Sequence, residues 1–241
     1  MNKLKRIVRH IANAVEYPEL VKAHFNKLDK DFVQNLCFLK DKLNIRPNTI
    51  LDIGAAVGEW SKAASYVFPE SSIYAFEPIP AAFQKLQELK KINKKFSPFN
   101  YALSSKSGRT NFYLNDFFYS SSLLKMTDEG KEIFDFLKNE RLIEVECRKL
   151  EELDDIQYKS PIFLKLDVQG AELTVLEGAG SILNKTDVIQ LELNFDRFYQ
   201  DQANYEDIIH FLNEKKFKYF FQTSQFYKNN TISFCDLIFW K

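Results

Sequence analysis

The spacing of hydrophobic residues changes near residue 47. Before this point apolar residues recur every three or four positions, which is typical of amphipathic helices. The first such stretch contains Leu4, Ile7, Val8, Ile11 and Val15. A second runs from about residue 25 to residue 43 and is followed by Pro47. We therefore expect a helical extension over residues 1–46, ahead of one domain over residues 47–241.

From residue 50 onward, short apolar runs alternate with helical stretches. The runs predict strands at residues 50–53, 72–76, 98–103, 162–168 and 188–193. The helical stretches cover residues 59–68, 81–92, 171–183 and 204–214. This alternation predicts a parallel sheet with helices on both faces.

Two regions depart from that rhythm. Between residues 104 and 150, two extra strands (110–114 and 143–148) flank a polar stretch and a short helix near 129–138. At the C-terminus, residues 218–222 and 233–240 form a hairpin around an Asn-Asn turn. A plain dinucleotide-binding fold ends with another parallel strand. We therefore predict an α/β fold with a Rossmann-like, seven-stranded sheet of the class I methyltransferase type, which ends in an antiparallel hairpin.

Composition indicates which partners and which cellular compartment to expect. The 33 basic and 33 acidic residues cancel, so no net field favours nucleic acid. The three cysteines are far apart and odd in number, which favours a reducing compartment. No uncharged apolar run is long enough to span a bilayer, and Arg9 and His10 interrupt any signal-peptide core. We expect a cytoplasmic protein without a transmembrane segment.

A nucleoside site is indicated by residues 49–60 together with Glu77. The first segment reads as a buried strand with Asp52 near its end, followed by a turn with Gly54 and Gly58. Glu77 lies 25 residues after Asp52, at the end of the next strand. In one β-α-β unit the glycines let the backbone approach a ligand, and the second acid takes the ribose hydroxyls. The chain is therefore expected to bind an adenosine-type cofactor.

The glycine spacing favours one such cofactor over another. The pattern Gly54-x-x-x-Gly58 differs from the Gly-x-Gly-x-x-Gly turn that binds a diphosphate. Glu59, at the start of the following helix, would also repel a diphosphate. Asp52 can instead take the ammonium group of S-adenosylmethionine, directly or through water. The residues thus favour S-adenosylmethionine over a nicotinamide dinucleotide.

Polar side chains follow two strands that should be buried. Lys165 and Asp167 share one face of residues 162–168, and Glu192 and Asn194 share one face of residues 188–194. Central parallel strands are normally apolar on both faces, and ligands bind at their carboxyl ends. Asp167, Glu192 and Asn194 are therefore expected to line a cleft. Two alternatives remain open: an ion-pair network of Lys165 with Asp167, Glu172 or Glu192, or a divalent metal on Asp167, Glu192 and Asn194.

Several of these segments together resemble the FkbM-type methyltransferases. The segments are residues 51–55, 76–78, 100–104 with Gly108 after them, 164–173 and 176–179. The resemblance runs from about residue 48 to the C-terminus and leaves residues 1–46 outside. It implies O-methylation that depends on S-adenosylmethionine, often of sugar hydroxyls in glycans or natural products. It names no particular acceptor.

The resemblance also carries site residues. Asp52, Gly54 and Glu77 match the family's cofactor positions, residues 101–104 would lie beside the adenine, and Asp167 would lie at the methyl-transfer end. The complete set of expected cofactor contacts is Asp52, Gly54, Ala55, Gly58, Glu59, Trp60, Glu77, Pro78, Tyr101, Ala102, Leu103, Ser104 and Asp167.

A base is needed to take the proton of an acceptor hydroxyl. His10, His24 and His210 all lie outside the expected cleft, which leaves Asp167 or Glu192 as base, with Lys165 as a further catalytic candidate. The acceptor, a small molecule or a glycan, should contact the irregular segments near the aromatic clusters at 117–119 and 195–199. The expected acceptor contacts are Ser122, Asn194, Arg197 and Tyr199.

Alternative predictions remain open for residues 1–15 and for the function of the chain. The basic stripe over residues 1–15 either lies on an anionic membrane surface, or belongs to a helix that caps the domain or forms a homodimer. A nicotinamide-dependent oxidoreductase shares the acid after the second strand but needs a different glycine turn. A non-catalytic binding module is the remaining alternative, although it would not need the cleft carboxylates.

Overall fold

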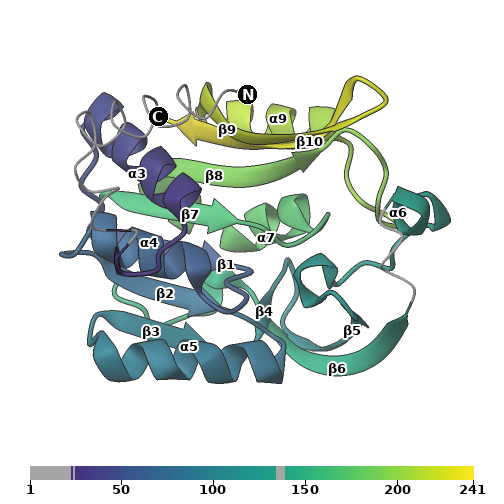
Figure 1. The fold of residues 1–241 in the computed structure, drawn as a ribbon, viewed down its shortest axis with the longest axis horizontal. Coiled ribbons are helices and arrows are strands. Elements are labelled where there is room, and N and C mark those ends of the chain that lie inside the picture. Colours follow the sequence, from purple (N-terminus) through teal and green to yellow (C-terminus); the bar gives the residue numbers. More distant parts are fainter. Residues whose placement is uncertain (1–22, 24, 134–138) are drawn as a thin grey trace.

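The computed structural model describes residues 23, 25–133 and 139–241 and is built on a seven-stranded sheet (Figure 1). The sheet has the order β3-β2-β1-β7-β8-β10-β9. Its strands are β1 (Thr49–Ile53), β2 (Ser72–Phe76), β3 (Phe96–Phe99), β7 (Ile162–Leu166), β8 (Thr186–Asn194), β9 (Lys218–Lys228) and β10 (Thr231–Trp240). The first five in chain order are parallel, and β10 pairs antiparallel with β8 and β9. The expected sheet and its C-terminal hairpin are confirmed.

Helices cover both faces of this sheet. The helices on one face are α3 (Lys30–Lys42), α4 (Glu59–Val67) and α5 (Pro80–Ile92). Those on the other face are α7 (Glu172–Ala179), α8 (Ile182–Lys185) and α9 (Tyr205–Glu214). None of the helices in the described part of the chain has the length and apolar character needed to cross a bilayer. The first helix expected from the sequence lies outside the described residues.

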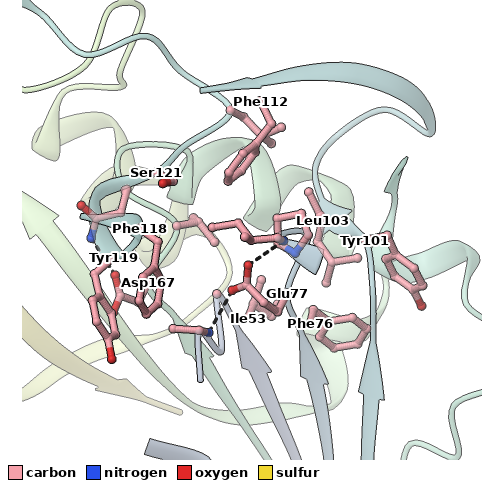
Figure 2. A pocket seen from close by; sticks show the side chains of 18 residues that line it. Ile53, Phe76, Glu77, Tyr101, Leu103, Phe112, Phe118, Tyr119, Ser121 and Asp167 are labelled. Carbon is pink, nitrogen blue, oxygen red and sulfur yellow. Dashed lines mark hydrogen bonds between the residues drawn. The ribbon is translucent and has the colours of Figure 1, made fainter. Parts of the chain in front are cut away.

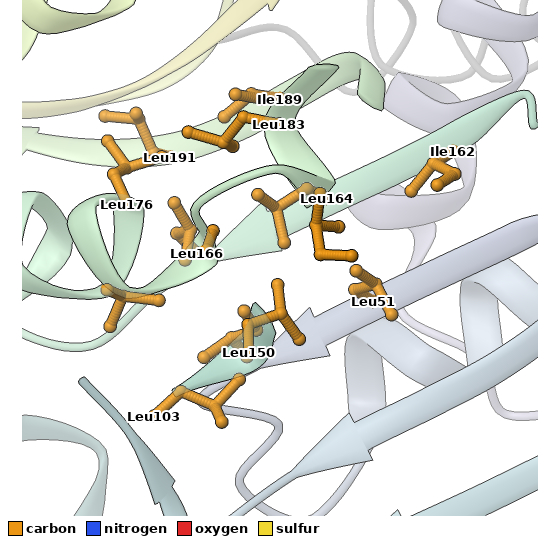
Figure 3. Close-up of a cluster of buried hydrophobic side chains, with 14 of the residues drawn as sticks. Leu51, Leu103, Leu150, Ile162, Leu164, Leu166, Leu176, Leu183, Ile189 and Leu191 are labelled. Carbon is orange, nitrogen blue, oxygen red and sulfur yellow. The ribbon is translucent and has the colours of Figure 1, made fainter. Parts of the chain in front are cut away.

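Side-chain alternation on the central strands divides the core in two. On β1, Leu51 and Ile53 belong to the cluster under α7 and α9, and Ile50 belongs to the cluster under α3 and α4. Figure 3 shows the first cluster, in which Leu51, Leu164, Leu166 and other aliphatic side chains interdigitate. Burial of each such side chain contributes about 1.5–3 kcal/mol. At the carboxyl ends of the central strands, the same alternation puts the polar residues on the face that α3 and α4 cover.

The irregular region after β3 forms a second sheet. Its order is β4-β6-β5, from β4 (Ala102–Leu103), β5 (Gly108–Asn115) and β6 (Glu140–Arg148). A short 3-10 helix, η1 (Phe118–Ser120), and α6 (Asp128–Ile133) lie between β5 and β6. This small sheet lies beyond the carboxyl ends of the parallel strands, at the right in Figure 1. The prediction of one strand over residues 98–103 is corrected, because the chain leaves the main sheet after Phe99 and joins β6.

The predicted helix over residues 171–183 is also divided in two. Gly180 ends α7 with φ +48°, and α8 begins at Ile182. A Cβ atom on Gly180 would lie 1.7 Å from the Glu151 carboxylate. The η2 turn (Leu150–Glu152) therefore packs against the end of α7, at a residue whose positive φ favours glycine.

Candidate active site

The turn after β1 is shaped by close contact with β7. Gly54 has φ +72°, and a Cβ atom there would lie 1.9 Å from the backbone oxygen of Asp167. Gly58 has φ +81° and packs under Leu86 and Leu89 of α5. The two glycines therefore bring the turn against the neighbouring strand end and against α5.

Glu77 is held in place by backbone amides. Its Oε2 accepts a hydrogen bond from the Ala56 N–H at 2.9 Å, and its Oε1 accepts one from the Ile79 N–H at 2.8 Å, as Figure 2 shows. The side chain is 4% exposed, and its burial raises the pKa of Glu77 to about 7. A carboxylate in this position keeps further lone pairs for a ligand.

Glu77 lies in a cavity at the carboxyl ends of β1, β2 and β7, which we name the Glu77 cavity. It encloses about 580 Å³ between protein atoms, part of it open to solvent. In Figure 2, Tyr101 and Phe76 lie on one side of Glu77, and Asp167 and Tyr119 lie on the other. The remaining lining is mostly apolar and includes Ile53, Gly54, Ala56, Pro78, Ile79, Ala102, Leu103, Phe112, Phe118, Leu123 and Val168. Such a lining suits a flat aromatic base with a polar group beside Glu77.

Asp52 and Lys165 form a buried pair beneath the glycine turn. The Lys165 Nζ lies 3.1 Å from Asp52 Oδ1 and donates a hydrogen bond to the Gly54 carbonyl at 2.9 Å. Ser61 donates to the other oxygen of Asp52. Burial alone would lower the pKa of Lys165, but the carboxylates of Asp52 and Asp167 outweigh it, so this pKa is raised. The pair anchors the turn, and Asp52 itself has no exposed surface.

Asp167 is far more accessible than Asp52 and Glu77. Its side chain is 44% exposed, and its Oδ2 lies 3.8 Å from Lys165 Nζ. Three neighbouring cavities share it: the Glu77 cavity, a second cavity over Lys165 and Trp60, and a third that contains Glu192. A group bound in the first cavity and a group bound in the third would therefore meet at Asp167.

Gln169 connects Asp167 to Glu192. Its Nε2 donates to Asp167 Oδ1 at 2.8 Å and to Glu192 Oε1 at 3.2 Å. Its Oε1 accepts a hydrogen bond from the Tyr199 hydroxyl at 2.8 Å. The backbone of Gln169 has φ +56°, which is unusual for a residue other than glycine. Such strain is typical of functional sites.

Glu192 is a different kind of acid from Asp167. Its pKa is raised well above the ordinary value because the carboxyl is buried and because Asp167 and Asp236 carry like charges nearby. Asp236 lies opposite Glu192 in the β8–β10 pairing. Two neighbouring acids in unlike environments are suited to unlike roles.

The cavity that contains Glu192, which we name the Glu192 cavity, encloses about 680 Å³. Its lining combines aromatic rings with polar groups: Phe117, Tyr119, Ser120, Asp167, Gln169, Glu192, Asn194, Phe198, Tyr199 and Phe234. Asn194 and Tyr199, both expected to contact an acceptor, belong to this lining. Ser122 is buried and donates to the backbone oxygen of Gln169, and Arg197 is exposed and donates to Asn204.

The segment around η1 lies over all of these cavities. Tyr119 lines each of the three, and its hydroxyl donates to Glu59 Oε2, 3.2 Å away at the start of α4. Its ring stacks on Phe118 with centroids 4.1 Å apart. Burial, with Glu59 as a further cause, raises the pKa of Tyr119 to about 12, so the phenol keeps its proton. The hydrogen bond between Tyr119 and Glu59 thus holds η1 across the site.

The other residues that were expected to contact the cofactor lie in different places. Ala55, Glu59 and Trp60 line the cavity over Lys165. Ser104 lies away from the Glu77 cavity, with its backbone oxygen 2.0 Å from where a Cβ atom of Gly178 in α7 would be. Among the described residues, no group of three or more His, Cys, Asp or Glu side chains is arranged to hold a metal ion.

Sequence reasoning did not single out several residues of the site. Gln169 stood in the motif that carried the resemblance but received no role. Its only local signal is its place between a strand-end aspartate and Gly170. Phe112 and Asp236 come from strands whose partners are far away in the sequence, so no local pattern marks them.

Comparisons of the sequence with known proteins find methyltransferases. The methyltransferase FkbM domain matches residues 52–219. The 2-O-methyltransferase NoeI of Sinorhizobium fredii is 26% identical over 171 residues, which are 68% of this chain and 70% of that protein. The hexuronic acid methyltransferase AglP of Haloferax volcanii is 25% identical over 148 residues, which are 61% of this chain and 56% of that protein.

Solved structures show weaker similarity. The magnesium protoporphyrin IX methyltransferase of Synechocystis PCC 6803 with bound SAH aligns over 98% of this chain and 99% of that chain, with 12% identity and a TM-score of 0.48. The precorrin-6y C5,15-methyltransferase of Geobacter metallireducens GS-15 aligns over 86% of this chain and 87% of that chain, with 14% identity and a TM-score of 0.46.

Proposed function

Because the chain belongs to the FkbM methyltransferase family, we propose that it transfers a methyl group from S-adenosylmethionine to a sugar hydroxyl. One of its relatives, a hexuronic acid methyltransferase, supports a sugar as the acceptor, and another, a 2-O-methyltransferase, supports transfer to an oxygen atom. The observation that carries the proposal is the position of Asp167, which lines both the Glu77 cavity and the Glu192 cavity.

The Glu77 cavity fits the nucleoside part of the cofactor. The amide-anchored carboxylate of Glu77 has lone pairs free for ribose hydroxyls, and the rings of Phe76 and Tyr101 lie beside it. When bound, S-adenosylmethionine supplies an electrophilic methyl group. The Asp52 carboxylate is paired with Lys165 beneath the glycine turn, so we assign Asp52 to the support of that turn. Any contact between the turn and the cofactor is then made by backbone groups.

Asp167 is the residue that we assign as proton acceptor. Its carboxylate is half-exposed, and Gln169 fixes one oxygen by a hydrogen bond. Glu192 lies behind Gln169, where its raised pKa favours the protonated acid. We assign Lys165 and Gln169 as positioning residues, and no metal ion is needed for this role of Asp167.

Calorimetric titration tests the cofactor assignment. We expect S-adenosylhomocysteine to bind and NAD not to bind, because the turn at Gly54 lacks the spacing that receives a diphosphate. Binding of NAD in place of S-adenosylhomocysteine would overturn the proposal.

Asp167→Asn tests the proton acceptor. We expect the variant to keep its affinity for S-adenosylhomocysteine within about threefold and to lose at least about a hundredfold in turnover, because an amide does not take up the hydroxyl proton. Turnover is measured as S-adenosylhomocysteine released in the presence of an accepted sugar. Near-normal turnover would reject Asp167 as base.

Residues 1–46 retain three proposed roles, as a cap, as a homodimer contact or as a membrane-surface element. Val33, Leu36 and Leu39 of α3 share a core cluster with Trp60 and Ala63 of α4, which supports a capping role for this part. The basic stripe over residues 1–15 lies outside the described residues. Flotation with anionic liposomes, wild type against a chain that lacks residues 1–15, tests the membrane contact.

A further inference from the structure

The Glu192 cavity carries information about the charge of its ligand. We propose that it binds a pyranose ring without an acidic substituent and discriminates against uronic acids and sugar phosphates. This inference rests on the proposed function, because it takes the Glu192 cavity as the acceptor site.

The shape and surface of the cavity fit a sugar ring. Five aromatic side chains contribute to its lining: Phe117, Tyr119, Phe198, Tyr199 and Phe234. The Phe198 and Phe234 rings meet edge to face, with centroids 6.1 Å apart, so they present both an edge and a face. Aromatic faces suit the C–H surface of a pyranose, and the side-chain amide of Asn194 and the carboxylate of Asp167 suit its hydroxyls.

The side chains at the cavity that can become charged near neutral pH are acids. Asp167 and Glu192 line it, and Asp236 lies opposite Glu192 on β10. No lysine or arginine belongs to the described residues that line it. Lys165 on β7 lies 3.1 Å from Asp52 and 3.8 Å from Asp167, so these carboxylates already engage its charge. Arg197 follows β8 but is exposed and donates to Asn204.

An acidic substituent would therefore meet repulsion without a partner. Because Lys165 is shared between Asp52 and Asp167, these three groups keep one net negative charge. At about 6 Å from that charge, a second anion is disfavoured by at least about tenfold at an effective dielectric near 20 to 40. Desolvation in the aromatic lining adds to this cost, because a buried anion needs paired hydrogen-bond donors. A neutral ring meets neither penalty, so charge complementarity selects it.

Matched pairs of sugars test the inference on the full chain. Methyl glycosides of glucose, galactose and mannose are compared with their uronic acid counterparts, which differ only in the C6 group. Binding is measured by ligand-observed NMR with S-adenosylhomocysteine present, and turnover is measured with S-adenosylmethionine. We expect the neutral member of an accepted pair to exceed the acidic member by at least about tenfold, with a smaller ratio at high salt.

Two results would overturn the inference: an acidic sugar that equals or exceeds its neutral partner, or no binding by any of these sugars. The proposed methyltransferase function fails separately, because it fails when S-adenosylhomocysteine does not bind.

A pair of variants at Phe117 isolates charge from shape. Phe117 is 45% exposed, so neither Phe117→Lys nor Phe117→Leu disturbs the core, and a thermal melt checks each fold. The lysine and the leucine both remove the ring, but only the lysine adds a cation to the cavity lining. We expect the acidic-to-neutral ratio to be at least about fivefold higher in Phe117→Lys than in Phe117→Leu. Equal ratios would show that charge does not set the choice.

Discussion

Glu77 serves the fold and the ligand with the same carboxylate. The Ala56 and Ile79 amides hold it between the turn after β1 and the start of α5, while its remaining lone pairs face the cavity. Its pKa of about 7 reflects burial that these two hydrogen bonds do not fully offset. The protonation state of Glu77 should therefore depend on both pH and the bound ligand.

Cofactor affinity should consequently depend on pH. The ionised carboxylate accepts two hydroxyl hydrogen bonds, and the protonated acid accepts fewer, so affinity for S-adenosylhomocysteine should rise as pH increases through about 7. Glu77→Gln should bind about tenfold or more weakly at pH 8 and should lose this dependence. Calorimetry from pH 6 to 8 measures both effects. A wild-type affinity that is flat over this range would argue against hydroxyl contacts at Glu77.

Gln169 has a similar double role among the acids. It separates Asp167 from Glu192 by donating one hydrogen bond to each, and Tyr199 orients its amide. The left-handed backbone at this position costs about 1 kcal/mol, which stays in any non-glycine variant. Variants at this position therefore report on the side chain alone.

Gln169→Leu should reduce turnover more than cofactor affinity. Leucine has a similar size but donates no hydrogen bond, so the Asp167 carboxylate is no longer fixed and we expect a drop of about tenfold to a hundredfold in kcat. The pH profile of kcat should also shift, because the two acids lose the shared amide. A purely structural role would lower the melting temperature and leave the kcat profile of the folded enzyme in place.

At the scale of elements, the site depends on how closely β1 and β7 end beside each other. The Ile53 carbonyl accepts a hydrogen bond from the Asp167 N–H, and Gly54 packs directly on the Asp167 carbonyl. The same backbone carries the glycine turn and the acid that we assign as base. Register between the two strands therefore sets the distance between the cavities.

Gly54→Ala should break this contact. The added Cβ would lie 1.9 Å from a backbone oxygen, so we expect a loss of more than about 2 kcal/mol in the free energy of unfolding. Gly108→Ala is a control for backbone strain without a clash, because Gly108 has φ +139° and no atom within 4 Å of its added Cβ. Urea denaturation compares the two. Equal losses would mean that backbone strain, rather than the clash with β7, limits residue 54.

At the scale of the whole molecule, the site concentrates buried acids at one edge of the sheet. Burial raises the pKa of Glu77 and of Glu172 to about 7 and that of Asp236 to about 6. The folded state thus binds more protons than the unfolded state between about pH 4.5 and 7. Stability from these groups is present at the low end of this window and is lost as pH rises through it.

Glu172→Gln should reduce this pH dependence. The Glu172 carboxylate accepts hydrogen bonds from the Val168 and Gly170 amides through one oxygen, and a glutamine carbonyl can accept both. We expect the variant to gain on the order of 1–3 kcal/mol relative to wild type between pH 5 and 7.5, by urea denaturation. A constant difference between the two proteins over this range would contradict the linkage.

Local patterns determined much of this molecule. Period-two and helical spacing are properties of adjacent residues, so the order of strands and helices, the closing hairpin and the strand-end positions of Glu77, Asp167, Glu192 and Asn194 could be read from the chain. The glycine turn before α4 was equally local, since positive φ and a helix start leave a signature in a few residues.

Only the tertiary structure decided which of these polar residues face a ligand and which face one another. Asp52 and Lys165 lie opposite each other on β1 and β7 and pair beneath the turn, whereas Asp167, two residues beyond Lys165 on the same face, reaches open cavities. Phe112 and Phe234 arrive at the site from distant segments. Burial and charge pairing depend on neighbours across the sheet, and no local spacing records them.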